Sequence, residues 1–586
     1  MPTFTTRPEL RGSFGMVAST HWLATAAGMA VLERGGNAFD AAVATGFTLQ
    51  VVEPHLNGPG GDLPIVFWSA ERGEPLVLCA QGVAPAAATI ERFRGLGHDL
   101  IPGTGLLAAC VPGAFDGWLT LLRDFGTLAL EDVIQYAIGY AEHGYPVVDG
   151  ITMTIERSEP LLRKWPASAE LYLPAPRPGA RFRNPALAAT YARIVRESRG
   201  GSREQELDRA RDLFYRGFVA AAIDEHSAAE GGLLTGDDLA AWRATLESPV
   251  PYDFRGLTVC KAGPWSQAPV FLQQLALLDG LPLDEMSDAE RVHVITECAK
   301  LAFADREAFY GDVDDVPLLQ LLSADYNAER RGLVGDDASR ELRPGGGRLP
   351  KFVADSHKVA TTVGAGEPTR AGSVGGKAAD ARPEDRVAFR APGGDTVHLD
   401  VADRFGNFVS ATPSGGWLHS SPVIRELGWP LGTRAQMFWL EEGLPSSLRP
   451  RTRPRTTLSP TLVLRGGEPE LALGTPGGDQ QDQWTLHVFL NHVVHGMNLQ
   501  EAIDAPEHHT DHFPSSFYPR QARPASLSLE ARFGDSVAAE LRERGHEVEV
   551  TPEWSLGRVT AVGRDREGFL RAGANPRGMQ GYAAGR

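Results

Sequence analysis

Apolar residues follow two different spacings along this chain. Helical spacing marks stretches such as 132–146, whereas short runs rich in β-branched residues, such as 396–403 and 459–464, indicate strands. In ERVHVITECAKLAFADR, one helical face carries four small or apolar residues: Val294, Cys298, Leu301 and Ala302. Because helical and extended segments alternate, the pattern predicts a mixed α/β protein.

The first hundred residues contain an Ala-rich helix candidate, Ala38 to Gln50, followed by the glycine-rich loop VEPHLNGPGGD. We expect the glycines at positions 58, 60 and 61 to adopt backbone conformations that other residues avoid, as in loops that line a site. No GxGxxG opens a helix after a strand, and there is no GxxxxGK[ST]. Dinucleotide-binding and P-loop folds are therefore excluded.

Between about 331 and 394, Gly, Pro, Arg and Asp replace the large apolar residues. Such a stretch does not repay its ordering entropy, so the sequence predicts a flexible segment. The segment ends abruptly in GGDTVHLDVADRFGNFVSA, which alternates like a strand. A cut in the chain at this join would explain the abrupt change.

Composition narrows the class of partner. The 586 residues are 42% apolar, enough for a large core, and length alone would suggest three or four units. The net charge of −17 disfavours a nucleic-acid or anionic-membrane partner. We find no span typical of a membrane helix and no leader-like N-terminus, so we expect a cytoplasmic protein. Four cysteines without CxxC spacing predict buried thiols: Cys79, Cys110, Cys260 and Cys298.

Around the join the chain resembles the gamma-glutamyltranspeptidase family of N-terminal-nucleophile hydrolases. Eight ordered segments carry the resemblance: GGNAFDAAVA (35–44), VVEPHLNGPGGD (51–62), VPGAFDGW (111–118), ECAKLAFADREAFYGD (297–312), DTVHLDVADRFGN (395–407), TTLSPTLVL (456–464), GTPGG (474–478) and GANPRGMQGYAAG (573–585). The resemblance implies an α/β (α+β) fold, specifically a four-layer αββα sandwich. A large subunit, 1–395, and a small subunit, 396–586, would form it together as one domain.

The resemblance also implies self-cleavage between Asp395 and Thr396, which makes Thr396 the first of the 191 residues that run to Arg586. The chemistry explains why a threonine is needed there. A hydroxyl is a weak nucleophile, and a freed α-amine with a pKa of about 7.7–8.0 takes the proton from its own side chain. In the precursor, the same hydroxyl would attack the carbonyl of Asp395.

Other site residues are carried over by position. Gly477 and Gly478 would donate backbone N–H groups to the oxyanion, each worth on the order of 3–4 kcal/mol in the transition state. Ser414 would hold the nucleophile and its amine, with Thr412 as the alternative. Thr456 and Thr457 take the place of the paired serines that touch the substrate carboxylate.

The residues that would clamp a γ-glutamyl group are mostly absent. Where the family has an arginine, this chain has Gln81. The family's asparagine is replaced by Gly416 and its aspartate by Trp439, whereas its glutamine is kept as Gln436. Each lost charge-assisted hydrogen bond costs roughly ten- to a hundredfold in affinity. We therefore expect a substrate-binding site around Gln81, Gln436, Trp439, Thr456 and Thr457 that accepts a non-glutamyl or bulky acyl group. Trp417 and Trp439 would supply aromatic walls, and the short segment after Trp439 would leave the cleft open.

Several further polar residues have simpler interpretations. The histidines of EHHTDH (507–512) are interpreted as exposed polar residues rather than metal ligands, because neither HExxH nor CxxC accompanies them. His55 and His398 are expected to orient neighbours or serve the structure, and Asn407 to stabilise a β-turn. We expect neither a metal nor another cofactor.

The sequence thus predicts a self-cleaving amide hydrolase or acyltransferase that works through an acyl-threonine intermediate on a small-molecule amide or peptide. Its two subunits would come from one precursor, an arrangement that allows a homodimer of heterodimers. Three alternatives stay open. These are a true γ-glutamyl hydrolase or transpeptidase acting on glutathione-like substrates, a hydrolase of an activated C–C bond in secondary metabolism, and a non-catalytic relative that is never processed.

Overall fold

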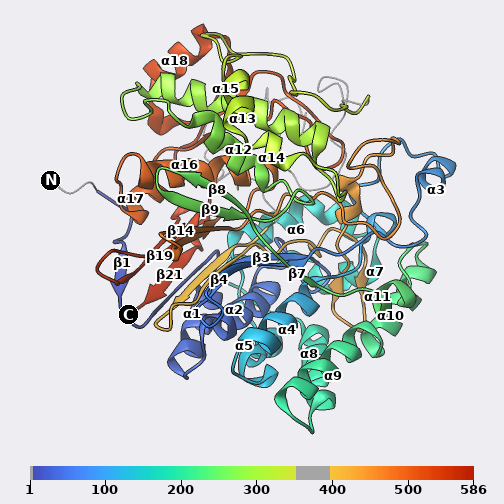
Figure 1. Ribbon diagram of the computed structural model, residues 1–586. Helices are drawn as coiled ribbons and strands as arrows, with labels where there is room; N and C mark the ends of the chain where they lie inside the picture. The colour runs from blue at the N-terminus through green and yellow to red at the C-terminus, as the bar shows by residue number, and fades with distance from the viewer. Residues whose placement is uncertain (1–3, 352–395) are drawn as a thin grey trace.

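The computed structural model describes residues 4–351 and 396–586, and these residues build four layers (Figure 1). Two seven-stranded sheets lie face to face in the middle, with one layer of helices on each outer side. The predicted αββα sandwich is therefore confirmed, and it places both N-terminal and C-terminal parts of the chain in the same sheets.

The first sheet is antiparallel throughout and joins strands from both ends of the chain. Its order is β21 (Tyr582–Gly585), β2 (Gly15–Ser19), β10 (Leu399–Asp403), β11 (Phe408–Ala411), β3 (Leu63–Ser69), β4 (Glu74–Ala80) and β7 (Thr245–Glu247). The predicted strand at 396–403 is thus β10, a buried inner strand that begins just after Thr396.

The second sheet is antiparallel as well. Its order is β1 (Leu10–Gly12), β20 (Leu570–Ala574), β19 (Thr560–Arg564), β15 (Glu468–Gly474), β14 (Thr461–Arg465), β9 (Leu257–Lys261) and β8 (Val250–Phe254). Buried side chains from both sheets fill the space between them, among them Met16 and Val66 from the first and Leu462 and Val562 from the second.

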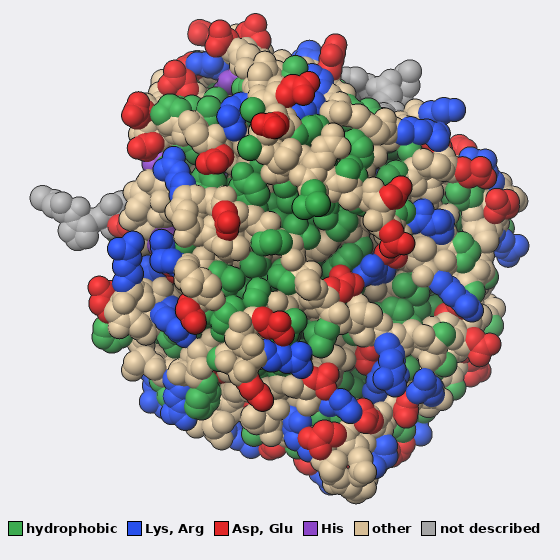
Figure 2. All heavy atoms as spheres, viewed as in Figure 1, with side chains coloured by type: hydrophobic (Ala, Val, Ile, Leu, Met, Phe, Trp, Pro, Cys, Tyr) green, Lys and Arg blue, Asp and Glu red, His purple; other side chains and the backbone are tan. Residues whose placement is uncertain are grey.

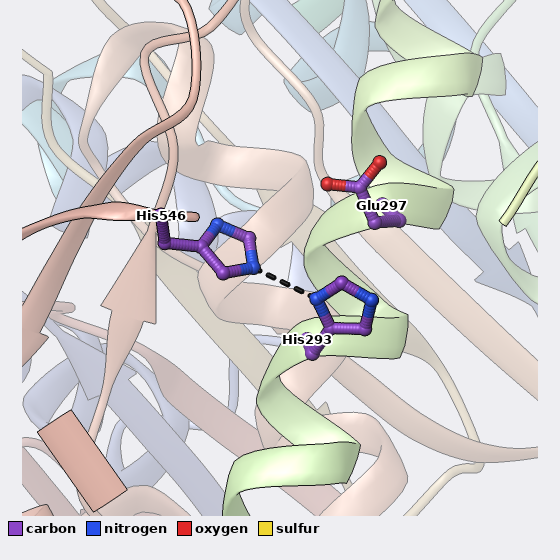
Figure 3. Close-up of side chains that lie close together, drawn as sticks. All are labelled: His293, Glu297 and His546. Carbon is purple, nitrogen blue, oxygen red and sulfur yellow. Dashed lines mark hydrogen bonds between the residues drawn. The ribbon is translucent and has the colours of Figure 1, made fainter. Parts of the chain in front are cut away.

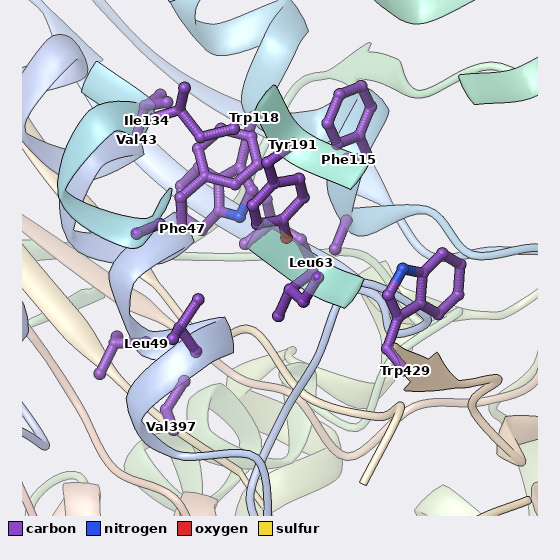
Figure 4. Packing of buried hydrophobic residues seen from close by; sticks show 14 of the residues in the cluster. Val43, Phe47, Leu49, Leu63, Phe115, Trp118, Ile134, Tyr191, Val397 and Trp429 are labelled. Carbon is purple, nitrogen blue, oxygen red and sulfur yellow. The ribbon is translucent and has the colours of Figure 1, made fainter. Parts of the chain in front are cut away.

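The outer face of the first sheet is covered by helices of the N-terminal half (Figure 1). The helices on this side of the molecule are α1 (Trp22–Glu33), α2 (Ala38–Val52), α4 (Ala114–Phe125), α5 (Leu130–His143), α6 (Asp149–Leu162), α7 (Pro166–Tyr172), α8 (Pro185–Ser198), α9 (Arg203–Tyr215), α10 (Phe218–Ala229) and α11 (Gly236–Ala241). Phe47, Phe115, Trp118 and Tyr191 lie at the centre of this core, next to Leu63 of β3 (Figure 4).

The second sheet is covered by a separate group of helices, and a further apolar cluster lies beneath them. These helices are α12 (Pro269–Leu278), α13 (Asp288–Phe309), α14 (Leu318–Leu321), α15 (Ala324–Arg331), α16 (Gln481–Val493), α17 (Leu499–Asp504) and α18 (Asp535–Glu543). The predicted amphipathic helix is α13, but it is buried on most sides, Glu297, Lys300 and Arg306 included. Its charged residues are inside because they pair with one another and with neighbouring segments.

Smaller elements complete the structure. Helix α3 (Ile90–Gly95) lies at one end, and three small sheets pair β5 (Tyr145–Pro146) with β6 (Arg181–Phe182), β12 (Val423–Ile424) with β13 (Trp429–Pro430), and β16 (His508–His509) with β17 (Ser526–Glu530) and β18 (Glu547–Thr551). On the face shown in Figure 2, hydrophobic side chains gather near the middle and charged ones mainly around them.

Helix α2 shows how local sequence sets an element. The Asn37 side chain accepts hydrogen bonds from the N–H groups of Phe39 and Asp40, and the Asp40 carboxylate accepts one from the Asn37 N–H. This capping box satisfies the first free donors of the helix. The predicted helix from Ala38 to Gln50 is confirmed and extends to Val52.

Two composition-based expectations concern burial and membranes. Cys79, Cys110, Cys260 and Cys298 are all buried free thiols, as predicted. Among the described residues, no helix combines the length and the apolar character that a membrane crossing requires.

Of the segment predicted to be flexible, residues 331–351 are described, and Gly345 N–H donates to Asp305 at 2.7 Å there. Residues 352–394 and Asp395 lie outside the described residues.

Candidate active site

Thr396 lies fully buried at the entrance to β10, in the middle of the first sheet. It forms an antiparallel bridge with Ser414, and the Val397 N–H donates to the Pro413 carbonyl at 3.1 Å. The hydroxyl oxygens of Thr396 and Ser414 are 3.1 Å apart, within hydrogen-bond distance. The structure therefore brings together the predicted nucleophile and the predicted supporting hydroxyl, whereas Thr412 bonds elsewhere.

Ser414 is in turn held by the glycine-rich loop. Its carbonyl accepts from the Asp62 N–H at 2.8 Å, and its own N–H donates to the Asp62 carbonyl at 3.0 Å. A Cβ atom on Gly61 would lie 2.0 Å from the Ser414 oxygen, so only glycine allows this approach. The expectation of unusual backbone angles at Gly58, Gly60 and Gly61 was wrong, since none has a positive φ. These glycines are needed for close packing.

His398 connects the nucleophile strand to the second sheet. Its Nδ1 lies 2.8 Å from the Thr412 hydroxyl, and its Nε2 lies 2.9 Å from the Asp400 carboxylate. Asp400 also accepts from the Thr560 hydroxyl of β19 at 2.8 Å. A Cβ atom on Gly474, the last residue of β15, would lie 2.3 Å from the His398 ring. The start of β10 and the end of β15 are thus in direct contact.

The predicted oxyanion glycines follow β15 directly. Gly477 has φ +133° and Gly478 has φ +56°, conformations that favour glycine. A Cβ atom on Gly477 would also lie 2.3 Å from the Trp484 ring. Within the described residues, neither glycine N–H donates a hydrogen bond, and the segment leads into the N-terminus of α16. Both N–H groups are therefore available to an anionic oxygen.

Gln267 joins this glycine loop to the threonine pair, and sequence reasoning assigned it no role. Its backbone N–H donates to the Thr456 carbonyl at 2.8 Å, and its amide donates to the Gly478 carbonyl at 3.4 Å. The Thr456 hydroxyl accepts from the Leu458 N–H at 3.4 Å. The Thr457 hydroxyl is buried and has no hydrogen-bond partner among the described residues, so it is the freer of the two.

A buried network of ion pairs contacts Gln267 through Arg306, and sequence reasoning did not predict it. Arg306 donates to Gln267 at 2.9 Å and to Glu307 at 2.8 Å, and it pairs with Asp479, the residue after Gly478. Burial alone would raise the pKa of Glu307, but Arg455 and Arg306 outweigh it and hold that pKa below its usual value. The network fixes the segment that follows the glycines.

Three of the four clamp positions carry a side chain, and each of these side chains has its own partner. Gln81 is buried, and its amide donates to the Gly82 carbonyl at 3.3 Å. The Gln436 amide is occupied by the chain itself, since it donates to Thr433 and accepts from the Tyr518 N–H at 3.1 Å. Trp439 is buried beneath the Arg520 guanidinium, 4.4 Å from the ring centre. Burial, followed by the charge of Arg455, lowers the pKa of Arg520 to about 9.

One further group of side chains has metal-ligand chemistry. His293 and Glu297 of α13 face His546, and the two imidazoles are hydrogen-bonded at 2.9 Å (Figure 3). However, Glu297 already accepts from Lys300 at 2.5 Å and from Arg343 at 3.2 Å. Since its charge is met by two cations, we interpret the group as a link between α13 and the turn before β18.

The histidines of EHHTDH were predicted to be exposed, and this was wrong. His508 and His509 form strand β16 and are 5% exposed, while His512 is 3% exposed. The preceding Glu507 accepts from His487 at 2.7 Å. His508 and His509 are inside because their strand pairs with β17, and the His508 ring stacks on that of His487, with ring centres 4.0 Å apart. Asn407 has the predicted structural role, since its amide donates to Asp403 at 2.9 Å.

Comparison with known proteins agrees with this geometry. The family model described as Gamma-glutamyltranspeptidase matches residues 24–585. The Glutathione hydrolase-like YwrD proenzyme of Bacillus subtilis (strain 168) is 32% identical, with 98% of this chain and 99% of the relative covered. The Oxamate amidohydrolase proenzyme of Klebsiella pneumoniae is also 32% identical, with 97% of this chain and 98% of the relative covered.

Three solved structures are similar to this chain over its whole length. Two structures of LmbA2991 align with TM-scores of 0.92 and 0.90 at 55% and 54% identity, and both chains are covered completely. Cephalosporin acylase from Bacillus halodurans aligns with a TM-score of 0.82 at 28% identity, over 100% of this chain and 98% of that one.

Proposed function

The chain belongs to the gamma-glutamyltranspeptidase family, and from this premise we propose that it is a precursor that cuts itself between Asp395 and Thr396. Membership makes the chain an amide hydrolase or transferase. In our proposal the mature enzyme hydrolyses amides through an acyl–Thr396 intermediate, and transfer of the acyl group to an amine is the lesser activity.

The contact between the hydroxyls of Thr396 and Ser414, 3.1 Å apart in a buried site, carries the proposal. In the precursor, the Thr396 hydroxyl attacks the carbonyl before it, and the resulting ester is hydrolysed. The new α-amine of Thr396 then takes the proton from the same hydroxyl during attack on the substrate, because its pKa of about 7.7–8.0 suits a base at neutral pH. Ser414 keeps the hydroxyl oriented.

Two N–H groups complete the proposed chemistry. Those of Gly477 and Gly478 stabilise the oxyanion formed when Thr396 attacks the carbonyl. The contact between Gly474 and the His398 ring supports this assignment, because it joins the strand of the nucleophile to the strand that leads into the glycine loop. Asp479, paired with Arg306, keeps that loop in place.

For the substrate, we propose a non-glutamyl or bulky acyl group. Gln81 has no charge to offer a carboxylate, the Gln436 amide is used by the protein, and Trp439 replaces an acidic partner of the substrate amine. The second candidate is γ-glutamyl hydrolysis or transfer on glutathione-like substrates. It is favoured by relatives named glutathione hydrolase proenzymes, for example one of Bacillus subtilis that is 28% identical over 98% of this chain.

Denaturing electrophoresis of the purified protein tests the cleavage. Wild type should give two pieces of about 395 and 191 residues, with Thr396 as the new N-terminus by mass spectrometry. Thr396→Ala should stay uncut, Thr396→Ser should cut more slowly, and the exposed-site control Thr245→Ala should cut like wild type. A single uncut band for wild type would refute the proposal. A γ-glutamyl anilide compared with aromatic acyl anilides then separates the two substrate classes.

A further inference from the structure

Arg434 is a buried cation that pairs with Asp62, the residue whose backbone is bonded to Ser414. It opens the short 3₁₀ helix Arg434–Met437 and is 3% exposed. Its Nη2 donates to Asp62 Oδ1 at 3.1 Å, and its Nε lies 3.0 Å from Asp62 Oδ2. One edge of the guanidinium is therefore occupied by this carboxylate.

Asp62 ties that guanidinium to the catalytic turn. The backbone of Asp62 exchanges two hydrogen bonds with Ser414, whose hydroxyl faces Thr396. A Cβ atom on the next residue, Gly415, would lie 3.6 Å from Arg434 Nη2. The guanidinium thus lies close to Gly415, the residue that follows Ser414 in this turn.

Two aromatic rings surround the guanidinium. Its carbon lies 5.3 Å from the centre of the Trp417 ring and 5.9 Å from that of Phe517, distances at which a ring face stabilises a cation. Trp417 and Phe517 also pack together in one small apolar cluster with Met437. Water is largely excluded there, so a charged hydrogen bond is stronger than it would be at the surface.

The other edge of the guanidinium is unsatisfied. Arg434 Nη1 is buried and has no hydrogen-bond partner among the described residues. An arginine side chain has five N–H donors in a planar fork, and leaving buried donors unpaired costs free energy. An oxygen of a bound ligand would satisfy them. Arginine binds two carboxylates on different edges readily, because the fork matches their geometry.

We propose that Arg434 is the specificity-determining cation of this site and that Nη1 binds the free carboxylate of an acyl donor whose carbonyl is attacked by Thr396. The preferred donors are then amides of dicarboxylic acids. This inference rests on the proposed function, and it assigns the substrate class for the same site. Asp62 is the positioning residue that orients the fork.

The test compares matched acyl groups. The 4-nitroanilides of succinic and glutaric acids carry a free carboxylate, and those of butyric and pentanoic acids do not. For wild type we expect kcat/KM to favour the acidic member of each pair by about 10- to 100-fold, the worth of one charge-assisted hydrogen bond. In Arg434→Gln this ratio should fall to about one, and Arg434→Lys should retain part of it.

Arg425→Gln is the matched control, because Arg425 is exposed and pairs with Glu170 at the surface. Its ratio should equal that of wild type. A wild-type ratio at or below one would overturn the inference. So would an Arg434→Gln variant in which both rates fall equally, because that result indicates a purely structural ion pair.

A binding measurement separates this inference from the proposed function. If wild type hydrolyses no anilide at all, the proposed function fails. Calorimetry with glutarate and with pentanoate still decides the role of Arg434. Binding of glutarate alone to wild type, lost in Arg434→Gln, supports the carboxylate site, and the absence of glutarate binding to wild type contradicts it.

Discussion

The hydroxyls of Thr396 and Ser414 approach to 3.1 Å although 18 positions separate them, because a tight hairpin brings β11 back along β10. Ser414 is not free to move in response to its neighbour. Both its backbone groups are bonded to Asp62, and the Gly61 backbone lies directly against its carbonyl. The hydroxyl of the proposed nucleophile thus faces a second hydroxyl that the glycine-rich loop holds in place.

Ser414→Ala should therefore slow both self-cleavage and amide hydrolysis. Loss of a hydrogen bond to the attacking hydroxyl costs about 1–3 kcal/mol, which corresponds to roughly ten- to a hundredfold in rate. Ser414→Thr, which keeps the hydroxyl, should lose less. Cleavage half-time and kcat measure the effect, and Ser13→Ala at an exposed position is the control. Unchanged rates in Ser414→Ala would remove Ser414 from the mechanism.

The contact between Gly474 and His398 gives a second prediction. In Gly474→Ala the new methyl group would lie 2.3 Å from the imidazole, so β10 or β15 must shift. We expect a loss of about 1–3 kcal/mol in the free energy of unfolding, as for other overpacked cores, with a larger loss of activity. The same substitution at Gly95, which has no atom within 4 Å, should change neither. A fully active Gly474→Ala would show that this contact does not position the site.

The sequence predicted the parts of the fold that local patterns encode. Local composition located α2 and β10, because an Ala-rich stretch favours a helix and a run of β-branched residues favours a strand. The four layers and the proposed role of Thr396 came from the resemblance, because periodicity does not determine how distant elements pack.

Long-range pairs could not be predicted. Asp62 and Arg434 are 372 positions apart, and Arg306 and Asp479 are 173 apart. Nothing in the local sequence of either partner identifies the other, and a charged residue alone is more often exposed than buried. The burial of His508 and His509 was missed for the same reason, since their strand partner β17 lies about twenty residues further on.

Arg306 should be one of the most sensitive positions in the fold. Its side chain bonds to Gln267, Glu307 and the Pro514 carbonyl, and it pairs with Asp479. Arg306→Leu leaves two buried carboxylates with less compensation, so we expect a loss of about 3–5 kcal/mol in urea unfolding. Arg465→Leu breaks a partly exposed pair with Glu470 and should cost less than about 1 kcal/mol. Equal losses in the two variants would contradict the importance of the network.

Glu53 should make stability depend on pH. The side chain is fully buried, and burial raises its pKa to about 7 against the opposing effects of the Thr20 hydroxyl and the Arg558 charge. Because the folded pKa exceeds the unfolded value of about 4.5, the stabilisation is complete below pH 4.5 and is lost as pH rises through 7. The amount is about 3 kcal/mol. Glu53→Gln stays neutral, so the unfolding free energy of wild type minus that of the variant should fall by this amount between pH 4.5 and 7.5. Glu71→Gln, at an exposed position, is measured beside it as the matched control. A flat difference for Glu53→Gln would contradict the raised pKa of its carboxyl.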